Sequence, residues 1–333
     1  MSDSQSNPLN PATTDPLREA FECLRHQVAG QILNQSALVE RLLIALLADG
    51  HLLVEGAPGL AKTKAVKSLA GGLEGDFHRI QFTPDLLPTD LTGTEVYHPQ
   101  DGSFRFDPGP VFHNLLLADE VNRAPAKVQS ALLEAMGERQ VTVGRATYPL
   151  PPLFLVMATQ NPIEQEGTYP LPEAQLDRFL MHVTVGYPDF DTEKAILRLN
   201  RQEARFEAPP PATRMSQATI FAARQAVLGL FMSPDVEDYL THLVLATRNP
   251  TSYNPRLSGW LRFGASPRAT LALDRCTRAR AWLRGRDYVS PEDVQALAPD
   301  ILRHRVLLSY AAEAEGRTAQ AYIDLLLKIL PVP

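Results

Sequence analysis

Residues 51–69 constrain the fold of this chain more than any other segment. Residues 52–54 are a short apolar run of the kind that forms a buried strand. A loop rich in Gly and Pro follows, and from residue 62 to 69 apolar side chains recur at helical spacing. A strand, a glycine loop that ends in Lys-Thr, and a helix together predict a loop that binds phosphate groups.

The residue types of this loop suit a nucleoside triphosphate. Glycines let backbone N–H groups approach phosphate oxygens, and the helix N-terminus adds a positive dipole. Lys62 would bridge the β- and γ-phosphates, and the Thr63 hydroxyl would bind Mg²⁺. The strict pattern has Gly before the Lys, and here Ala61 is tolerated because that residue already begins the helix. The alternative is an ordinary turn between strand and helix. The predicted nucleotide-binding residues are Gly56, Ala57, Pro58, Gly59, Leu60, Ala61, Lys62 and Thr63.

Length and composition bound the class of protein. The 333 residues suffice for about two domains, and 44% hydrophobic and 21% charged residues are ordinary for a globular chain. A net charge of −6 argues against a dedicated nucleic-acid-binding protein. Cys23 and Cys276 are far apart without metal-binding spacing, so we expect a reducing, cytoplasmic environment. No apolar run is long enough to span a membrane.

A second apolar run, at residues 115–118, leads directly into Asp119 and Glu120. It predicts a buried parallel strand that ends in two carboxylates. Ligands in open α/β sheets bind at the carboxyl ends of the strands, where the phosphate loop also lies. We therefore expect Asp119 to hold Mg²⁺ and Glu120 to act as the general base on the attacking water. The alternative is a strand that happens to end in solvated acids.

A third apolar run, at residues 153–157, precedes Asn161. A polar side chain there can hold water near the γ-phosphate, although Asn before Pro also forms turns. Strands alternate with helices up to residue 188, which predicts a doubly wound α/β core with a parallel sheet. Turn residues predict inserted hairpins at residues 95–106 and 139–150.

The sequence predicts three regions. Residues 1–16 are polar and Pro-containing and are expected to form a disordered tail. Residues 17–188 form the α/β core, and residues 189–333 a small all-α lid, because no buried strand pattern follows residue 188. One of the lid helices is predicted over residues 291–308, after a Ser-Pro-Glu-Asp start.

Taken together, these motifs resemble those of the MoxR family of AAA+ ATPases. The resemblance rests on the phosphate loop, Asp119 to Ala124, Ala158 to Pro162, Tyr169 to Phe179 and Gly264 to Ala269. It implies ATP and Mg²⁺ as cofactors, and a homo-oligomeric ring that is typically a hexamer.

The resemblance also implies roles for single residues. Arg178 looks like the arginine finger, which would reach the γ-phosphate bound by a neighbouring subunit. Arg268 looks like the lid arginine that touches the nucleotide of its own subunit. Asn161 matches the sensor position, and the stretch around Gly30 lies where the family packs adenine.

By the same resemblance, ATP hydrolysis would drive chaperone-like remodelling or maturation of client proteins. A partner with a von Willebrand factor A domain is expected, and the client is not named by the sequence. Two alternatives stay open. One is a chelatase-like motor subunit that inserts a metal, and the other is a nucleotide-gated assembly scaffold that barely hydrolyses ATP. Glu120 argues against the scaffold, because losing that acid is the simplest way to stop hydrolysis.

Overall fold

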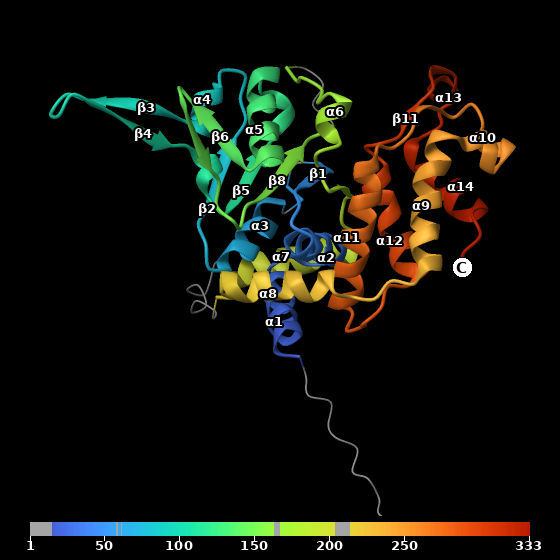
Figure 1. Ribbon diagram of the computed structural model, residues 1–333. Helices are drawn as coiled ribbons and strands as arrows, with labels where there is room; N and C mark the ends of the chain where they lie inside the picture. Colours follow the sequence, from blue (N-terminus) through green and yellow to red (C-terminus); the bar gives the residue numbers. More distant parts are fainter. Residues whose placement is uncertain (1–14, 58, 61, 163–166, 204–213) are drawn as a thin grey trace, which may run out of the picture.

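The centre of the molecule is a five-stranded parallel sheet in the order β2-β5-β8-β1-β9 (Figure 1). The structure is a computed structural model that describes residues 15–57, 59–60, 62–162, 167–203 and 214–333. The sheet confirms the predicted doubly wound α/β fold. Its strands are β1 (Leu52–Gly56), β2 (Phe77–Gln81), β5 (Leu115–Asp119), β8 (Leu155–Gln160) and β9 (Met181–Val185).

Alternate residues of each central strand pack on opposite faces of the sheet. Leu52 and Leu115 belong to the apolar cluster formed with α1, α2 and α3, whereas Leu53 and Leu116 belong to the cluster formed with α5. This double burial explains why β1, β5 and β8 read as continuous apolar runs. The helices of this part are α1 (Pro16–Gln31), α2 (Ser36–Leu47), α3 (Lys62–Gly71), α4 (Pro88–Thr92), α5 (Ala126–Glu138) and α6 (Glu173–Leu176).

Two antiparallel hairpins are inserted into the core, as predicted. Strands β3 (Gly93–His98) and β4 (Ser103–Pro108) form an arm that projects from the body, at the left of Figure 1. Strands β6 (Gln140–Val143) and β7 (Ala146–Pro149) form the second hairpin. The Phe106 ring at the base of the arm stacks on Tyr148 of the second hairpin, with ring centroids 4.0 Å apart. The two hairpins therefore pack as one unit at their bases.

The chain after β9 is helical apart from one short strand pair in the described ranges. Helix α8 packs on α1, α2 and α11, so it lies with the core helices although it follows residue 188 in sequence. The boundary at residues 188 and 189 stays a prediction. The elements are α7 (Phe190–Glu203), α8 (Gln217–Leu228), α9 (Pro234–Arg248), α10 (Pro250–Tyr253), β10 (Leu261–Phe263), α11 (Pro267–Leu283), α12 (Pro291–Leu302), β11 (Leu307–Leu308), α13 (Tyr310–Ala314) and α14 (Ala319–Ile329).

Helix starts follow the expected capping chemistry. The Ser290 hydroxyl and the Asp293 carboxylate form a capping box at the start of α12. Asp15 accepts a hydrogen bond from the Leu17 N–H and caps α1, so the end of the predicted tail is ordered. The helix predicted over residues 291–308 instead ends at Leu302, and β11 pairs with β10. Among the described residues, no helix has both the length and the apolar character to cross a bilayer.

Candidate nucleotide site

The phosphate loop joins β1 to α3, and two of its glycines are required by geometry. A Cβ at Gly56 would lie 2.7 Å from the Val185 carbonyl oxygen, which is too close for any side chain. Gly59 has φ +82°, a left-handed conformation that favours glycine. Pro58 and Ala61 lie outside the described residues, and α3 begins at Lys62.

The Lys62 side chain folds over this loop. Its ammonium donates to the Gly56 carbonyl at 2.6 Å and to the Gln160 carbonyl at 3.4 Å. Burial lowers the pKa of Lys62, while the carboxylates of Asp119 and Glu120 oppose that shift. The ammonium is therefore held between the ends of β1 and β8, where a phosphate can replace the two carbonyls as its partner.

The acidic pair at the end of β5 is held by a buried hydroxyl. The Thr159 hydroxyl donates to Asp119 Oδ1 at 2.6 Å and accepts from the Glu120 N–H at 2.9 Å. Thr159 is fully buried, and Glu120 has a left-handed φ of +56°. Sequence reasoning missed Thr159. Its only signal was a hydroxyl residue at the end of the strand beside β5.

One cavity of about 390 Å³ brings together most of the predicted phosphate and water ligands, although Gly56 and Ala57 do not line it. Two unpredicted residues of β2, Arg79 and Gln81, also line it. The donor set fits Mg²⁺, because Thr63 and Asp119 offer a hydroxyl and a carboxylate and Mg²⁺ usually takes its other oxygens from phosphates and water. The predicted residues in the lining are Gly59, Leu60, Lys62, Thr63, Asp119, Glu120 and Asn161.

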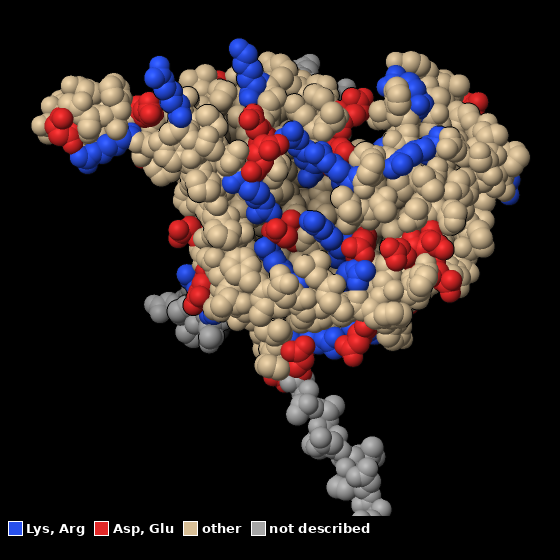
Figure 2. Space-filling view, in the orientation of Figure 1, with Lys and Arg blue, Asp and Glu red and all other residues tan. Residues whose placement is uncertain are grey.

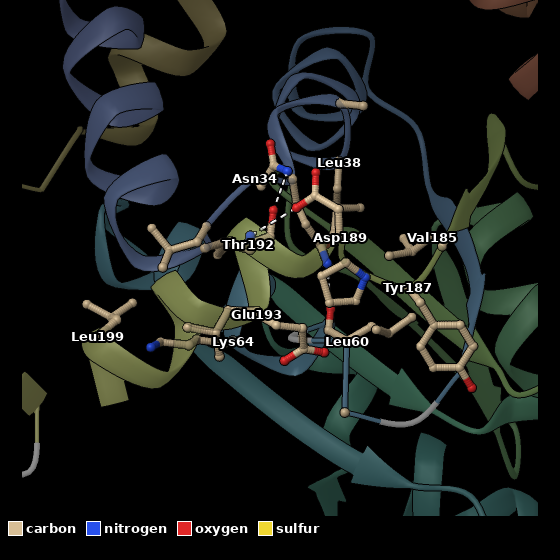
Figure 3. Close-up of a pocket in the computed structure, with 18 of the residues that line it drawn as sticks. Asn34, Leu38, Leu60, Lys64, Val185, Tyr187, Asp189, Thr192, Glu193 and Leu199 are labelled. Carbon is tan, nitrogen blue, oxygen red and sulfur yellow. Dashed lines mark hydrogen bonds between the residues drawn. The ribbon is translucent and has the colours of Figure 1, made fainter. Parts of the chain in front are cut away.

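A larger cavity of about 760 Å³ shares Gly59, Leu60 and Lys64 with the first one. It lies between the loop after α1, the end of β9 and helix α7 (Figure 3). The Asn34 amide donates to the Thr192 hydroxyl at 2.6 Å and ties the loop after α1 to α7. Figure 3 shows Tyr187 beside this cavity, and the residue is 74% exposed. The cavity is large enough for the nucleoside of a bound nucleotide.

Gly30, which we expected at the adenine, does not line the larger cavity. It is exposed near the end of α1, and the lining begins with the next residue, Gln31. The stretch around Gly30 therefore lies next to this cavity, and its role at the adenine stays a prediction.

Arg178 and Arg268 come together in a third cavity, of about 320 Å³. The Arg178 guanidinium donates to the Leu133 carbonyl, and Arg268 Nη1 lies 3.9 Å from Asp177 Oδ2. Figure 2 shows charged side chains of both signs along the boundary between the sheet and the lid. The arginines that line this cavity are Arg139, Arg178, Arg268, Arg275 and Arg305.

Asp177 explains why Arg268 lies there. Its Oδ2 accepts from the Ser266 hydroxyl at 2.7 Å, and its Oδ1 accepts from Arg305 Nε at 2.8 Å. The start of α11 is thereby tied to the turn that carries Arg178. Arg268, which we expected at the nucleotide of its own subunit, lines this third cavity and does not line the cavity that contains Lys62.

Comparisons with known proteins cover both the sheet and the lid. Residues 51–181 match the model of the ATPase family associated with various cellular activities, and residues 256–325 match the AAA lid domain. Chaperone MoxR1 of Mycobacterium tuberculosis is 47% identical over 305 residues, which are 91% of this chain and 79% of that protein. Protein MoxR of Paracoccus denitrificans is 35% identical, over 91% of this chain and 94% of that protein.

A solved structure agrees with the whole architecture. The crystal structure of an ATPase candidate from Cytophaga hutchinsonii superposes with a TM-score of 0.88 at 45% identity, and the match covers 95% of this chain and 96% of that one. Similarity at this level extends from the phosphate loop through the lid helices. The chain belongs to the MoxR family of AAA+ ATPases.

Proposed function

We infer that this AAA+ protein hydrolyses ATP in a Mg²⁺-dependent reaction. The observation that carries this proposal is the single cavity lined by Lys62, Thr63, Asp119, Glu120 and Asn161. It joins a phosphate-binding cation, two oxygen ligands for Mg²⁺, a general base and a polar group for water. The adjoining larger cavity has room for the nucleoside.

The side chains divide the reaction between them. Glu120 accepts a proton from the attacking water, and Asn161 orients that water toward the γ-phosphorus. A new P–O bond forms to the water oxygen as the bond to the bridging oxygen of the β-phosphate breaks, which yields ADP and phosphate. Lys62 balances charge on the phosphate oxygens. Mg²⁺, held by Thr63 and Asp119, would neutralise the charge that develops on the phosphates.

The active site is shared between neighbouring subunits of a ring, for which we propose a hexamer. The support is the basic cavity that presents Arg178 and Arg268 together, separate from the cavity that contains Lys62. An arginine supplied by a neighbour can stabilise transition-state charge on the γ-phosphate. We propose that both arginines face the nucleotide of the adjacent subunit.

The test is the ATPase rate per subunit across protein concentration, with native mass measured in parallel. We expect the rate to rise as rings form, and Arg178→Ala and Arg268→Ala each to assemble but remain slow. Arg25→Ala is the matched control, because Arg25 is a surface arginine that pairs with Glu22 on its own helix. A rate that is flat with concentration and unchanged in Arg178→Ala would overturn the shared site.

We further propose that ATP turnover remodels client proteins in the cytoplasm, with a von Willebrand factor A domain protein as partner. The similarity to a protein named as a chaperone supports this class of function over a chelatase-like motor. The arm supplies a contact surface, since Tyr97 and Phe104 are 52% and 66% exposed with ring centroids 5.2 Å apart. A Glu120 carboxylate inside the phosphate cavity favours hydrolysis over a scaffold that only binds ATP.

ATP turnover with candidate partners tests this second proposal. A true partner should raise or lower the rate of the wild-type ring, and a Tyr97→Ser, Phe104→Ser variant should lose the response to client while keeping its basal rate. Stimulation by a large chelatase subunit alone would favour the metal-insertion alternative instead.

A further inference from the structure

The carboxylate expected to hold Mg²⁺ already has a cation of the protein bound to it. Arg79 Nη2 and Nε donate to Asp119 Oδ2 at 2.6 and 3.1 Å. Ile80 packs in the cluster on the α5 side of the sheet, so Arg79 and Gln81 on either side of it face the phosphate loop. Arg79 lines the phosphate cavity, and its side chain is 48% exposed against 12% for Asp119.

Both oxygens of this carboxylate are engaged. Oδ2 accepts the two guanidinium bonds, and Oδ1 accepts the Thr159 hydroxyl. Mg²⁺ takes oxygen ligands in near-octahedral geometry and tolerates little distortion. A guanidinium and a divalent cation on the same carboxylate also repel each other at close range. Binding of the metal and binding of Arg79 at Asp119 therefore oppose one another.

The second carboxylate is linked to the same arginine. Arg79 Nη2 donates to Gln81 Oε1 at 3.1 Å, and Gln81 Nε2 donates to Glu120 Oε2 at 2.6 Å. A continuous chain of hydrogen bonds thus runs from Asp119 through Arg79 and Gln81 to Glu120. Moving Arg79 removes one of the two partners that position the Gln81 amide.

We propose that Arg79 is a built-in counter-ion of Asp119, which Mg²⁺ displaces when it enters with the nucleotide. This inference rests on the proposed ATPase function and assigns a positioning residue to it. In the absence of metal, Arg79 neutralises Asp119 and, through Gln81, holds Glu120. Glu120 Oε2 also pairs with Arg123 Nη1 at 3.2 Å, so loading of Mg²⁺ would remove the restraint that runs through Gln81 and leave the Arg123 pair in place.

A different role would leave a different signature. Arg79 could remain beside the nucleotide and bind a phosphate oxygen directly. Its removal would then weaken nucleotide binding whether or not Mg²⁺ is present. The counter-ion role instead predicts a change only in the dependence on Mg²⁺.

The experiment measures binding of a fluorescent, non-hydrolysable ATP analogue to the full chain, so that turnover plays no part. The analogue is titrated in EDTA, and MgCl₂ is then titrated at a fixed analogue concentration. We expect Arg79→Gln to lower the free Mg²⁺ concentration at half-maximal effect by about three- to fivefold, at the upper end of what a partly exposed ion pair contributes. Binding in EDTA should change less than about twofold, because Arg79 is paired there. Arg79→Lys keeps the charge and should stay near the wild type.

The control is Arg25→Gln, whose side chain is 49% exposed and pairs with a carboxylate outside the cavity. Unfolding midpoints of all variants check that the fold is intact. An unchanged Mg²⁺ midpoint in Arg79→Gln overturns the inference, as does equal weakening with and without Mg²⁺. Failure of the wild type to bind the analogue in Mg²⁺ would instead refute the proposed ATPase function itself.

Discussion

Replacing Thr159 by Val tests whether one buried hydroxyl organises Asp119 and Glu120, the proposed metal ligand and general base. The substitution nearly conserves shape and leaves no cavity, but it removes both hydrogen bonds of the hydroxyl. Asp119 Oδ1 loses a donor at 2.6 Å, and the Glu120 N–H loses an acceptor at 2.9 Å. Both acids then lose the contact that fixes them relative to each other.

The structure sets the size of the expected effect. A hydrogen bond to a charged group contributes about 1.5–3 kcal/mol, and Thr159 is fully buried, so water cannot replace it. If the lost hydrogen-bond energy raises the activation free energy by the same amount, kcat should fall by roughly 10- to 100-fold, since about 1.4 kcal/mol corresponds to tenfold in rate. Thr159→Ser keeps the hydroxyl and should stay within about threefold of the wild type.

The expected fall in kcat is measured by steady-state ATP turnover. Unfolding midpoints are measured on the same samples. Both variants are expected to remain folded and to form the same oligomer as the wild type. The reasoning is refuted if Thr159→Val turns over ATP at the wild-type rate, or if Thr159→Ser is as slow as Thr159→Val.

Three further predictions follow from other contacts. Burial lowers the pKa of His51 to about 3, and unfolded His titrates near 6.5, so the unfolded state binds more protons below that pH. Chemical denaturation should therefore show that the unfolding free energy decreases as the pH is lowered below about 6.5, and this group should account for a loss of roughly 2 kcal/mol at pH 5. His51→Gln should make that decrease smaller. Asp177→Ala leaves the buried Arg305 guanidinium without its carboxylate and should lower the unfolding free energy by about 3 kcal/mol, against about 1 kcal/mol for Ser266→Ala, in urea denaturation. Tyr187→Ala removes an aromatic ring from the larger cavity, where we propose that the nucleoside binds, and should raise KM for ATP several-fold with a smaller change in kcat; an unchanged KM would place the adenine elsewhere.

Local pattern was sufficient for the sheet and for the loops at its carboxyl edge. The three inner strands, β5, β8 and β1, are buried on both faces, so their apolar runs are visible in sequence without knowledge of their neighbours. The phosphate loop and the acidic pair follow such runs directly. Their meeting in one cavity then follows from the general rule for parallel sheets.

Contacts between distant segments could not be read in the same way. Arg79 and Thr159 meet Asp119 only because β2 and β8 flank β5, and strand order is not encoded in any local pattern. The helix predicted over residues 291–308 ends at Leu302. Just beyond it, the Arg305 guanidinium donates to the Phe179 and Leu180 carbonyls, a contact between distant segments that no local pattern predicts.

The stacking of Phe106 on Tyr148 joins the projecting arm to the second hairpin, so the arm is attached to the core both by its own chain and by this contact. Helix α4 connects the arm to β2, which carries Arg79 and Gln81, and the second hairpin is followed along the chain by β8, which carries Thr159. A force on the tip of the arm therefore has two routes along the chain to the strands that flank the acidic pair. Movement of the arm and the positions of Asp119 and Glu120 would then be coupled, in either direction.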